Sequence, residues 1–202
     1  RSTRSMSAEE NLLRAVCQIA DVDSAALLHG RLREVDIPRV VQAIGTLGDA
    51  AWAIGDEGTV RVADVRRQCE ALKVTSGLAL VVVDYLQLMT ATSKVTNRTE
   101  AVSEISRGLK CLARDLEVPV VALSQLSRAT KGQERKRPEL SDLRESGAIE
   151  QDADKVIFIH RDDTLSGETT EGSLLLSKNR QGPCAVIPAT WIAQSTRWLE
   201  ES

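Results

Sequence analysis

Two polar side chains follow two apolar runs, and their types suit nucleotide chemistry. Asp84 comes directly after the valine-rich run 78–83, and Gln125 follows the run 118–123 after one serine. Ligands of parallel α/β sheets collect at the carboxyl ends of strands, where an aspartate can hold the Mg²⁺ of a nucleotide. A glutamine at the same edge could sense a γ-phosphate or orient water. The alternatives are an acid that caps a turn or a following helix and an amide that faces solvent.

A pair of cations, Lys178 and Arg180, stands just before a Gly-Pro turn. Residues two apart on an extended strand point the same way, so both charges could reach across a subunit boundary. An arginine delivered to the γ-phosphate of a neighbouring subunit is a recurrent catalytic device. The alternative is a pair of exposed hairpin cations that are only solvated.

Two segments between these candidates could contact nucleic-acid phosphates. Residues 128–137 hold five basic residues and one acid, Glu134, in a polar stretch that predicts a surface loop. Such a loop could equally be only solvated. The stretch 142–147 combines the cation Arg144 with Gly147, where a backbone amide can approach a phosphate closely. Taken by itself, that stretch is more often a helix end.

The apolar pattern predicts the elements that position these residues. Helices are predicted to begin near residue 7, to cover 37–47, 60–73 and 98–116, and to begin again at Ser141. Strands are predicted at 51–54, 78–83, 118–123, 156–160, 173–177, 184–189 and 197–199. The runs 78–83 and 118–123 are apolar throughout, as in strands buried on both faces, and with the helix between them they form a βαβ unit.

Composition limits the remaining possibilities. A length of 202 residues suits one α/β domain with one core, and the net charge of −3 excludes a globally basic nucleic-acid binder but allows a local basic patch. The four cysteines form no Cys-x-x-Cys pair, so reduced thiols are expected rather than a zinc site or disulfides. Without a long apolar run or a signal-peptide pattern, the protein is expected to be soluble, cytoplasmic and not bound to membranes.

Together, these segments resemble the DnaB family of replicative helicases, whose motor is a RecA-like domain. The likeness covers essentially the whole chain, more loosely before residue 60. The motifs that carry it are Val-Asp-Tyr-Leu-Gln-Leu (83–88), Glu-Ile-Ser-Arg (104–107) with Leu-Lys (109–110), Val-Pro-Val (118–120), Ala-Leu-Ser-Gln-Leu-Ser-Arg (122–128), Lys-Arg-Pro (136–138), Asp-Leu-Arg-Glu-Ser-Gly (142–147) and Ile-Glu-Gln-Asp-Ala-Asp (149–154). The fold that the likeness implies is α/β and RecA-like, with a mainly parallel central sheet flanked by helices and antiparallel hairpin strands at the C-terminal end.

The resemblance also implies roles for individual residues. Asp84 would be the Walker B acid that holds Mg²⁺ through the nucleotide, and Gln125 the phosphate-sensing glutamine. Lys178 and Arg180 would enter the ATP site of a neighbouring subunit. The DNA-tracking positions would be Arg137, Arg144, Glu145 and Gly147. The implied ligands are ATP and Mg²⁺, and the implied partners are single-stranded DNA, further copies in a homo-hexamer and other replication proteins.

Two departures from the family pattern bear on catalysis. The chain has no Gly-x-x-x-x-Gly-Lys-Ser/Thr loop, whose amides and lysine cradle a triphosphate, and Ser5 precedes Met6 where the family has a catalytic glutamate. We therefore expect an N-terminally truncated RecA-like domain over 1–202. It would derive from an ATP-dependent helicase that moves 5′ to 3′ on single-stranded DNA and unwinds duplex at the fork, and it would be inactive as an ATPase by itself.

Two other hypotheses remain open at this point. A truncated or degenerate paralogue would keep the DNA-binding and ring-forming surfaces without catalysis, which Ser5 and the missing loop favour. A RecA-like recombination or repair ATPase would share the sheet and the position of Asp84 but would not require the stretch 142–147.

Overall fold

The computed structural model contains two compact units. It describes residues 7–56, 58, 60–93, 97–126, 137–161 and 169–200, and it leaves the side chains of residues 144–146 undescribed. One unit comprises Arg1–Asp56, Ile157–Leu176 and Cys184–Ser202, and the other comprises Glu57–Val156 and Ser177–Pro183. We call them unit 1 and unit 2. The single-domain assignment over 1–202 stays a prediction.

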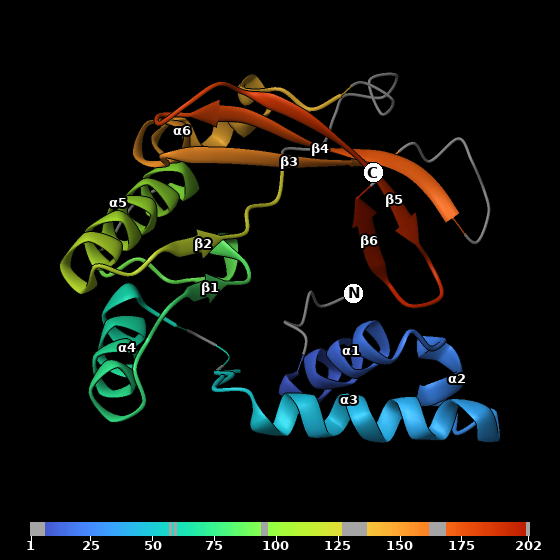
Figure 1. The fold of residues 1–202 in the computed structure, drawn as a ribbon. Coiled ribbons are helices and arrows are strands. Elements are labelled where there is room, and N and C mark those ends of the chain that lie inside the picture. Colours follow the sequence, from blue (N-terminus) through green and yellow to red (C-terminus); the bar gives the residue numbers. More distant parts are fainter. Residues whose placement is uncertain are drawn as a thin grey trace. The chain divides into compact units, whose positions relative to one another are not determined.

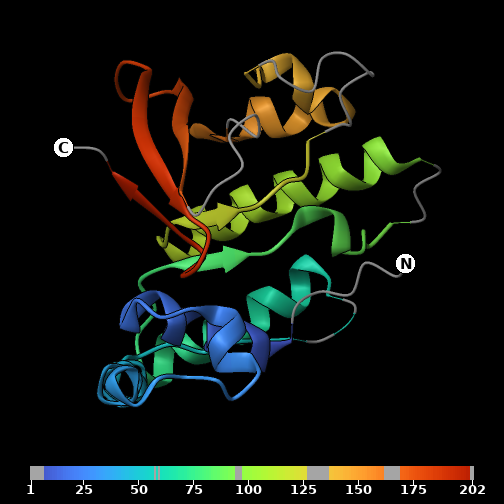
Figure 2. The same ribbon diagram turned by 90° about the vertical axis from the view of Figure 1, so that its right-hand side faces the viewer.

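Unit 2 is built on two parallel strands. Strand β1 (Val81–Val83) pairs with β2 (Val120–Ala122) in the register Val81↔Val120, Val82↔Val121 and Val83↔Ala122. Figure 2 shows the two arrows side by side and pointing the same way. The predicted strand–helix–strand order is confirmed, although each strand is shorter than its apolar run.

The helix between these strands, α5 (Arg98–Leu116), is capped at its first turn and ends on a left-handed residue. The Asn97 side chain accepts a hydrogen bond from the backbone N–H of Glu100 at 2.8 Å, which satisfies one of the free amides of the first turn. Glu117 ends the helix in the left-handed conformation, with φ 53°. The prediction of a helix over 98–116 is therefore confirmed at both ends.

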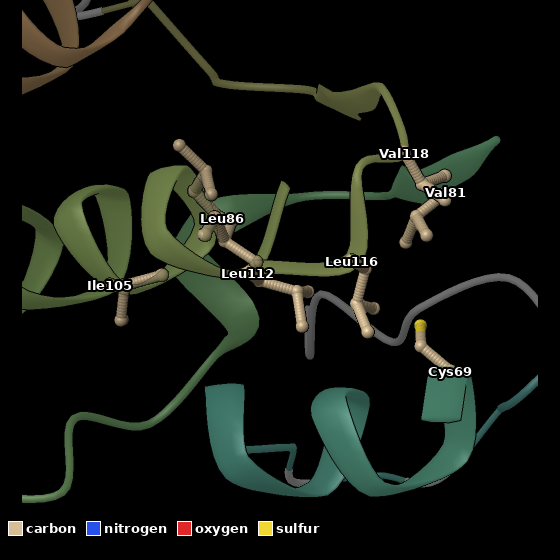
Figure 3. Packing of buried hydrophobic residues seen from close by; sticks show 8 residues of the cluster. Cys69, Val81, Leu86, Ile105, Leu112, Leu116 and Val118 are labelled. Atoms are coloured by element: carbon tan, nitrogen blue, oxygen red, sulfur yellow. The ribbon is translucent and has the colours of Figure 1, made fainter. Parts of the chain in front are cut away.

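One apolar core holds unit 2 together, and Figure 3 shows its packing. Its buried members come from α5, β1, the segment before β2, the 3-10 helix η2 (Leu86–Leu88) and helix α4 (Val62–Thr75). They are Cys69, Val81, Leu86, Ile105, Leu109, Leu112, Leu116 and Val118. The alternate positions Val82 and Val121 are 58% and 50% exposed, so the prediction that these strands are buried on both faces is wrong. Side chains alternate across a strand, and the core covers the Val81 face.

Truncation of this core has a predictable cost. Leu112 is fully buried, so Leu112→Ala is expected to lower the free energy of unfolding by about 2–5 kcal/mol, because the lost contacts leave a cavity. Urea denaturation followed by circular dichroism would measure the change. Leu80→Ala is a matched control, because Leu80 is 49% exposed and its loss should cost well under about 1 kcal/mol. Equal losses for the two variants would contradict this account of the core.

The described part of unit 2 also contains three short helices. They are the 3-10 helices η2 (Leu86–Leu88) and η3 (Leu140–Ser146) and the α-helix α6 (Gly147–Asp152). The predicted helix from Ser141 is confirmed as this η3–α6 pair, with Gly147 opening α6 instead of ending a helix. Helix α6 lies against α5 (Figure 1). Ile149 of α6 joins the apolar core, and the Ser106 hydroxyl of α5 donates to the Asp152 carboxylate at 2.8 Å.

The helices of unit 1 enclose a second, smaller core. They are α1 (Ala8–Ala20), α2 (Ser24–Leu28), the 3-10 helix η1 (Glu34–Asp36) and α3 (Ile37–Asp49). Ser7 and Glu10 form a capping box at the start of α1, which confirms the predicted helix start near residue 7. The buried side chains of Val16, Cys17, Val40 and Ala43 join α1 to α3.

The predicted strand at 51–54 is wrong. Residues 51–56 form no strand, and the Trp52 indole N–H donates to the Leu47 carbonyl at 2.9 Å, at the end of α3. That carbonyl belongs to the last helical turn and also accepts the Ala50 backbone N–H at 3.3 Å. The segment is therefore attached to the end of α3 and not to a sheet, and Trp52 is 44% exposed.

A four-stranded sheet in the order β3-β4-β5-β6 follows in the chain. Its strands are β3 (Lys155–Arg161), β4 (Thr169–Asn179), β5 (Ala185–Ile192) and β6 (Arg197–Glu200). Strands β4, β5 and β6 pair antiparallel, with Leu176 opposite Ala185 and Ile192 opposite Arg197, which confirms the predicted hairpin strands. Within unit 1, a Cβ on Gly172 would lie 2.6 Å from the Trp198 ring and 2.4 Å from the His160 carbonyl oxygen, so glycine is required there.

Among the described helices, none combines the length and apolar character needed to cross a membrane.

Candidate active site

The two predicted nucleotide-facing residues lie at the same edge of the parallel sheet. Asp84 directly follows β1, and Gln125 stands three residues beyond β2. The Leu123 peptide joins the two strand ends, because its N–H donates to the Val83 carbonyl and its carbonyl accepts from the Leu86 N–H, both at 2.9 Å. The structure therefore brings the two positions together on adjoining strands. Their chemical roles stay predictions.

The Gln87 side chain links the two strand ends further. Its Oε1 accepts a hydrogen bond from the Gln125 N–H at 3.2 Å, and its Nε2 donates to the Ser124 hydroxyl at 3.0 Å and to the Gln125 carbonyl at 3.2 Å. The Gln125 backbone is thus held on both its donor and its acceptor side. Sequence reasoning missed Gln87, because no local signal reports a contact between residues 38 apart in the chain.

The site suits a nucleotide-bound divalent cation. Asp84 and Gln125 are both exposed, so a ligand can reach them. Mg²⁺ is commonly bound by one or two carboxylates, with phosphate oxygens and water as its other ligands, so a single aspartate at a strand end fits it. Among the described residues there is no group of three or more His, Cys, Asp or Glu side chains that could hold a metal by themselves.

The predicted cation pair contacts helix α6. The Lys178 ammonium donates to the Glu150 carbonyl, and the Arg180 guanidinium donates to the Gln151 carbonyl and to the Asp154 carboxylate, the last at 3.2 Å. The backbone N–H of Arg180 also donates to the Asp154 carbonyl at 2.9 Å. The side chains therefore have protein partners, and the alternative of cations that are only solvated is wrong.

Asp154 has a second cationic partner, Lys110 on α5. The hydrogen bond from the Lys110 ammonium is the main reason that the pKa of the Asp154 carboxyl lies below its usual value, and Arg180 adds a smaller contribution in the same direction. Asp154 is therefore an anion between two cations at neutral pH. Because all three side chains are roughly half exposed, solvent screens the pairs and each adds little to stability.

The predicted DNA-facing positions lie before and within the η3–α6 pair. Arg137 is exposed, and Arg144 and Glu145 lie in η3. Gly147 is exposed at the first position of α6. The basic residues at 128–136, and Ser5 in the N-terminal segment, lie outside the described residues. Gly147 therefore lies in the same short helix as the Glu150 and Gln151 carbonyls, which Lys178 and Arg180 contact.

The parallel strands, the polar residues at their carboxyl edge and the hairpin strands define an α/β domain of the RecA-like class. Residues 2–200 match the model of the family described as the DnaB-like helicase C terminal domain, and the chain belongs to that family.

The curated relatives include the replicative DNA helicase DnaB of Geobacillus stearothermophilus, which is 41% identical over 198 residues. They also include the replicative DNA helicase DnaC of Bacillus subtilis, which is 39% identical over 198 residues. Each alignment covers 96% of this chain and 44% of the relative, so the chain spans less than half the length of these proteins.

Solved structures show the same fold. One of them, an ATPase domain, superposes with a TM-score of 0.89 at 31% identity, covering 98% of this chain and 72% of that one. A DnaB-like replicative helicase, solved in a study of its interactions with primase, gives a TM-score of 0.88 at 32% identity, covering 96% of this chain and 49% of that one. These likenesses confirm the predicted family and the RecA-like fold class.

Proposed function

We propose that this chain is the motor part of an ATP-dependent replicative DNA helicase that moves along single-stranded DNA and unwinds duplex at the fork. The observation that carries the proposal is the pairing of β1 with β2, which sets Asp84 and Gln125 at one sheet edge. Membership of the DnaB-like helicase family supports the same function. The comparisons give no advantage to a degenerate, non-catalytic paralogue.

The proposed reaction is hydrolysis of the bond to the γ-phosphate of ATP. Mg²⁺, when bound with the nucleotide, would neutralise phosphate charge that develops in the transition state. In this proposal Asp84 orients that ion, and Gln125 contacts the γ-phosphate or the attacking water from the neighbouring strand. Lys178 and Arg180 act on the nucleotide of an adjacent subunit, where their charge stabilises the phosphoryl group in transfer.

Hydrolysis should need residues beyond this chain. The sequence has no Gly-x-x-x-x-Gly-Lys-Ser/Thr loop, so the amides and lysine that usually bind the β- and γ-phosphates must be supplied by other residues. We therefore propose that the 202-residue chain by itself does not turn over ATP. ATP turnover should therefore be measured on the complete polypeptide that carries these residues.

The proposed DNA path follows from the charge distribution. With a net charge of −3 the chain cannot bind DNA over its whole surface, but a ring can present a local positive lining to a strand in its pore. We propose that Arg137, Arg144, Glu145 and Gly147 contribute to that lining in a homo-hexamer. In this proposal the protein acts in the cytoplasm with other replication proteins, of which a primase is one candidate because a structural neighbour was solved in that context.

A substitution at Gln125 tests the nucleotide site. In the complete polypeptide, Gln125→Ala should lower DNA-stimulated ATP turnover about 100-fold, a typical loss when one preorganised polar group leaves a transition state. The Kd of a fluorescent ATP analogue should change less than about threefold, because ground-state binding has other contacts. Turnover and DNA unwinding would be measured together, and both should fall in parallel.

The matched control is Gln42→Ala, because Gln42 is an exposed glutamine on α3. Its turnover should equal that of the unsubstituted protein. A Gln125→Ala protein that keeps full stimulated turnover would refute the assignment of Gln125 to the nucleotide site.

A further inference from the structure

Helix α6 ends on carbonyl groups that receive hydrogen bonds from the cation pair. The last carbonyls of any helix lack partners within the helix and carry partial negative charge, which favours a nearby cation. In α6, the Glu150 carbonyl accepts from Lys178 and the Gln151 carbonyl accepts from Arg180. The position of each cationic head is therefore set by the C-terminal end of α6.

Asp154 holds Arg180 at two points, the backbone and the guanidinium. It accepts the Arg180 backbone N–H through its carbonyl at 2.9 Å, and it accepts the guanidinium Nη1 through its carboxylate at 3.2 Å. The second oxygen of the carboxylate is occupied by the Lys110 ammonium. Lys110 belongs to α5, the helix whose buried face forms the core of unit 2, so the carboxylate is tied to a rigid element.

The same helix begins in the segment proposed to face DNA. Helix α6 opens at Gly147 and has six residues, which correspond to a length of about 9 Å at 1.5 Å per residue. A shift of its first turn therefore moves its last carbonyls as well, because a helix this short has no room to bend between them. The contacts to Glu150, Gln151 and Asp154 pass such a shift to Lys178 and Arg180.

We propose that Asp154 is the positioning residue of Arg180, and that it aligns the guanidinium for a neighbour's nucleotide according to the position of α6. This inference rests on the proposed role of Arg180. It adds a route by which DNA at the Gly147 end of α6 sets the activity of an arginine at the other end. Asp154 does not touch the nucleotide in this scheme and acts through Arg180 alone.

The test is Asp154→Asn in the complete polypeptide. Asparagine keeps the shape of the side chain and removes its charge, so the guanidinium loses its anionic partner. We expect DNA-stimulated ATP turnover to fall at least tenfold, and the ratio of stimulated to unstimulated turnover to fall with it. The Kd for an ATP analogue and the hexamer mass should stay unchanged, because the substitution leaves the Asp84 edge of the sheet intact. Asp154→Glu, which keeps the charge, should restore part of the ratio.

Asp115→Asn is the matched control. Asp115 is also an exposed carboxylate of unit 2 paired with an arginine, Arg66, at 2.9 Å, and its side chain is 41% exposed against 52% for Asp154. This control should keep the full stimulation ratio. If Asp115→Asn and Asp154→Asn lower the ratio equally, the effect belongs to ion pairs in general and the inference is wrong.

A double substitution separates positioning from structural support. If Asp154 acts through Arg180, Asp154→Asn should cause no further loss of turnover in an Arg180→Ala background, whereas independent effects would multiply. Multiplying effects, or a lone Asp154→Asn protein within twofold of the unsubstituted rate, would overturn the inference and leave the proposed function standing. If Arg180→Ala itself retains full turnover, the arginine assignment fails first and the inference fails with it.

Discussion

Arg180→Ala in the complete polypeptide is expected to lower DNA-stimulated ATP turnover by about 1000-fold or more, the usual effect of losing an arginine that stabilises phosphoryl transfer from a neighbouring subunit. The Kd for nucleotide should change little, because the arginine acts on charge that develops during the reaction. Steady-state turnover with and without single-stranded DNA would measure the loss. Arg67→Ala is the control, since Arg67 is an arginine of unit 2 that is 75% exposed and paired only loosely with Asp64, at 3.6 Å.

Mixed rings would show whether the arginine acts between subunits. Subunits with Arg180→Ala keep their own Asp84, and subunits with Asp84→Asn keep their own Arg180. A mixture therefore contains interfaces in which an intact nucleotide edge meets an intact arginine from the neighbour. Partial recovery of turnover on mixing is expected for action in trans. A mixture as inactive as either variant alone would argue for action within one subunit.

Asp84→Asn is expected to have the second largest effect, also about 1000-fold on turnover. A metal ion can contribute several kcal/mol of transition-state stabilisation, and each 1.36 kcal/mol corresponds to about a tenfold change in rate. The neutral amide should also raise the Mg²⁺ concentration needed for half-maximal turnover about 10- to 100-fold. Turnover measured across a Mg²⁺ titration would record both changes.

The control for this substitution is Asp49→Asn, at an exposed aspartate that ends α3. Its Mg²⁺ dependence should match that of the unsubstituted protein. If Asp84→Asn changes neither the turnover rate nor the Mg²⁺ concentration for half-maximal turnover, Asp84 does not hold the metal ion. The proposed function of the edge of β1 would then be wrong.

Elements with local signals were predicted well from the sequence. Helix α5 has an apolar stripe along its length and an asparagine, Asn97, before its first turn, and its predicted bounds match the structure. The adjacency of the two strand ends was also predictable, because a βαβ unit brings its strands into one parallel sheet. The likeness to the DnaB family supplied the roles of Asp84 and Gln125, which no local pattern could fix.

Features that depend on distant contacts could not be predicted in this way. The stretch 51–54 has an apolar, strand-like composition, but the hydrogen bond from Trp52 to Leu47 attaches it to a helix end. The exposure of Val82 and Val121 was missed because a continuous apolar run does not report which of its faces is covered. The contacts of Lys178 and Arg180 with α6 join residues 28 and 29 apart, and single-sequence periodicity carries no such information.

The dependence of α6 on residues made much later has a consequence for biosynthesis. A helix of six residues is too short to persist in water unaided, since nucleation is costly and few hydrogen bonds follow it. When Asp152 has just been added to the growing chain, Lys178 and Arg180, which donate to the Glu150 and Gln151 carbonyls, are still to be translated. We expect this segment to reach its final conformation only after the Gly-Pro turn at 182–183 has emerged, which would place its maturation late in co-translational folding.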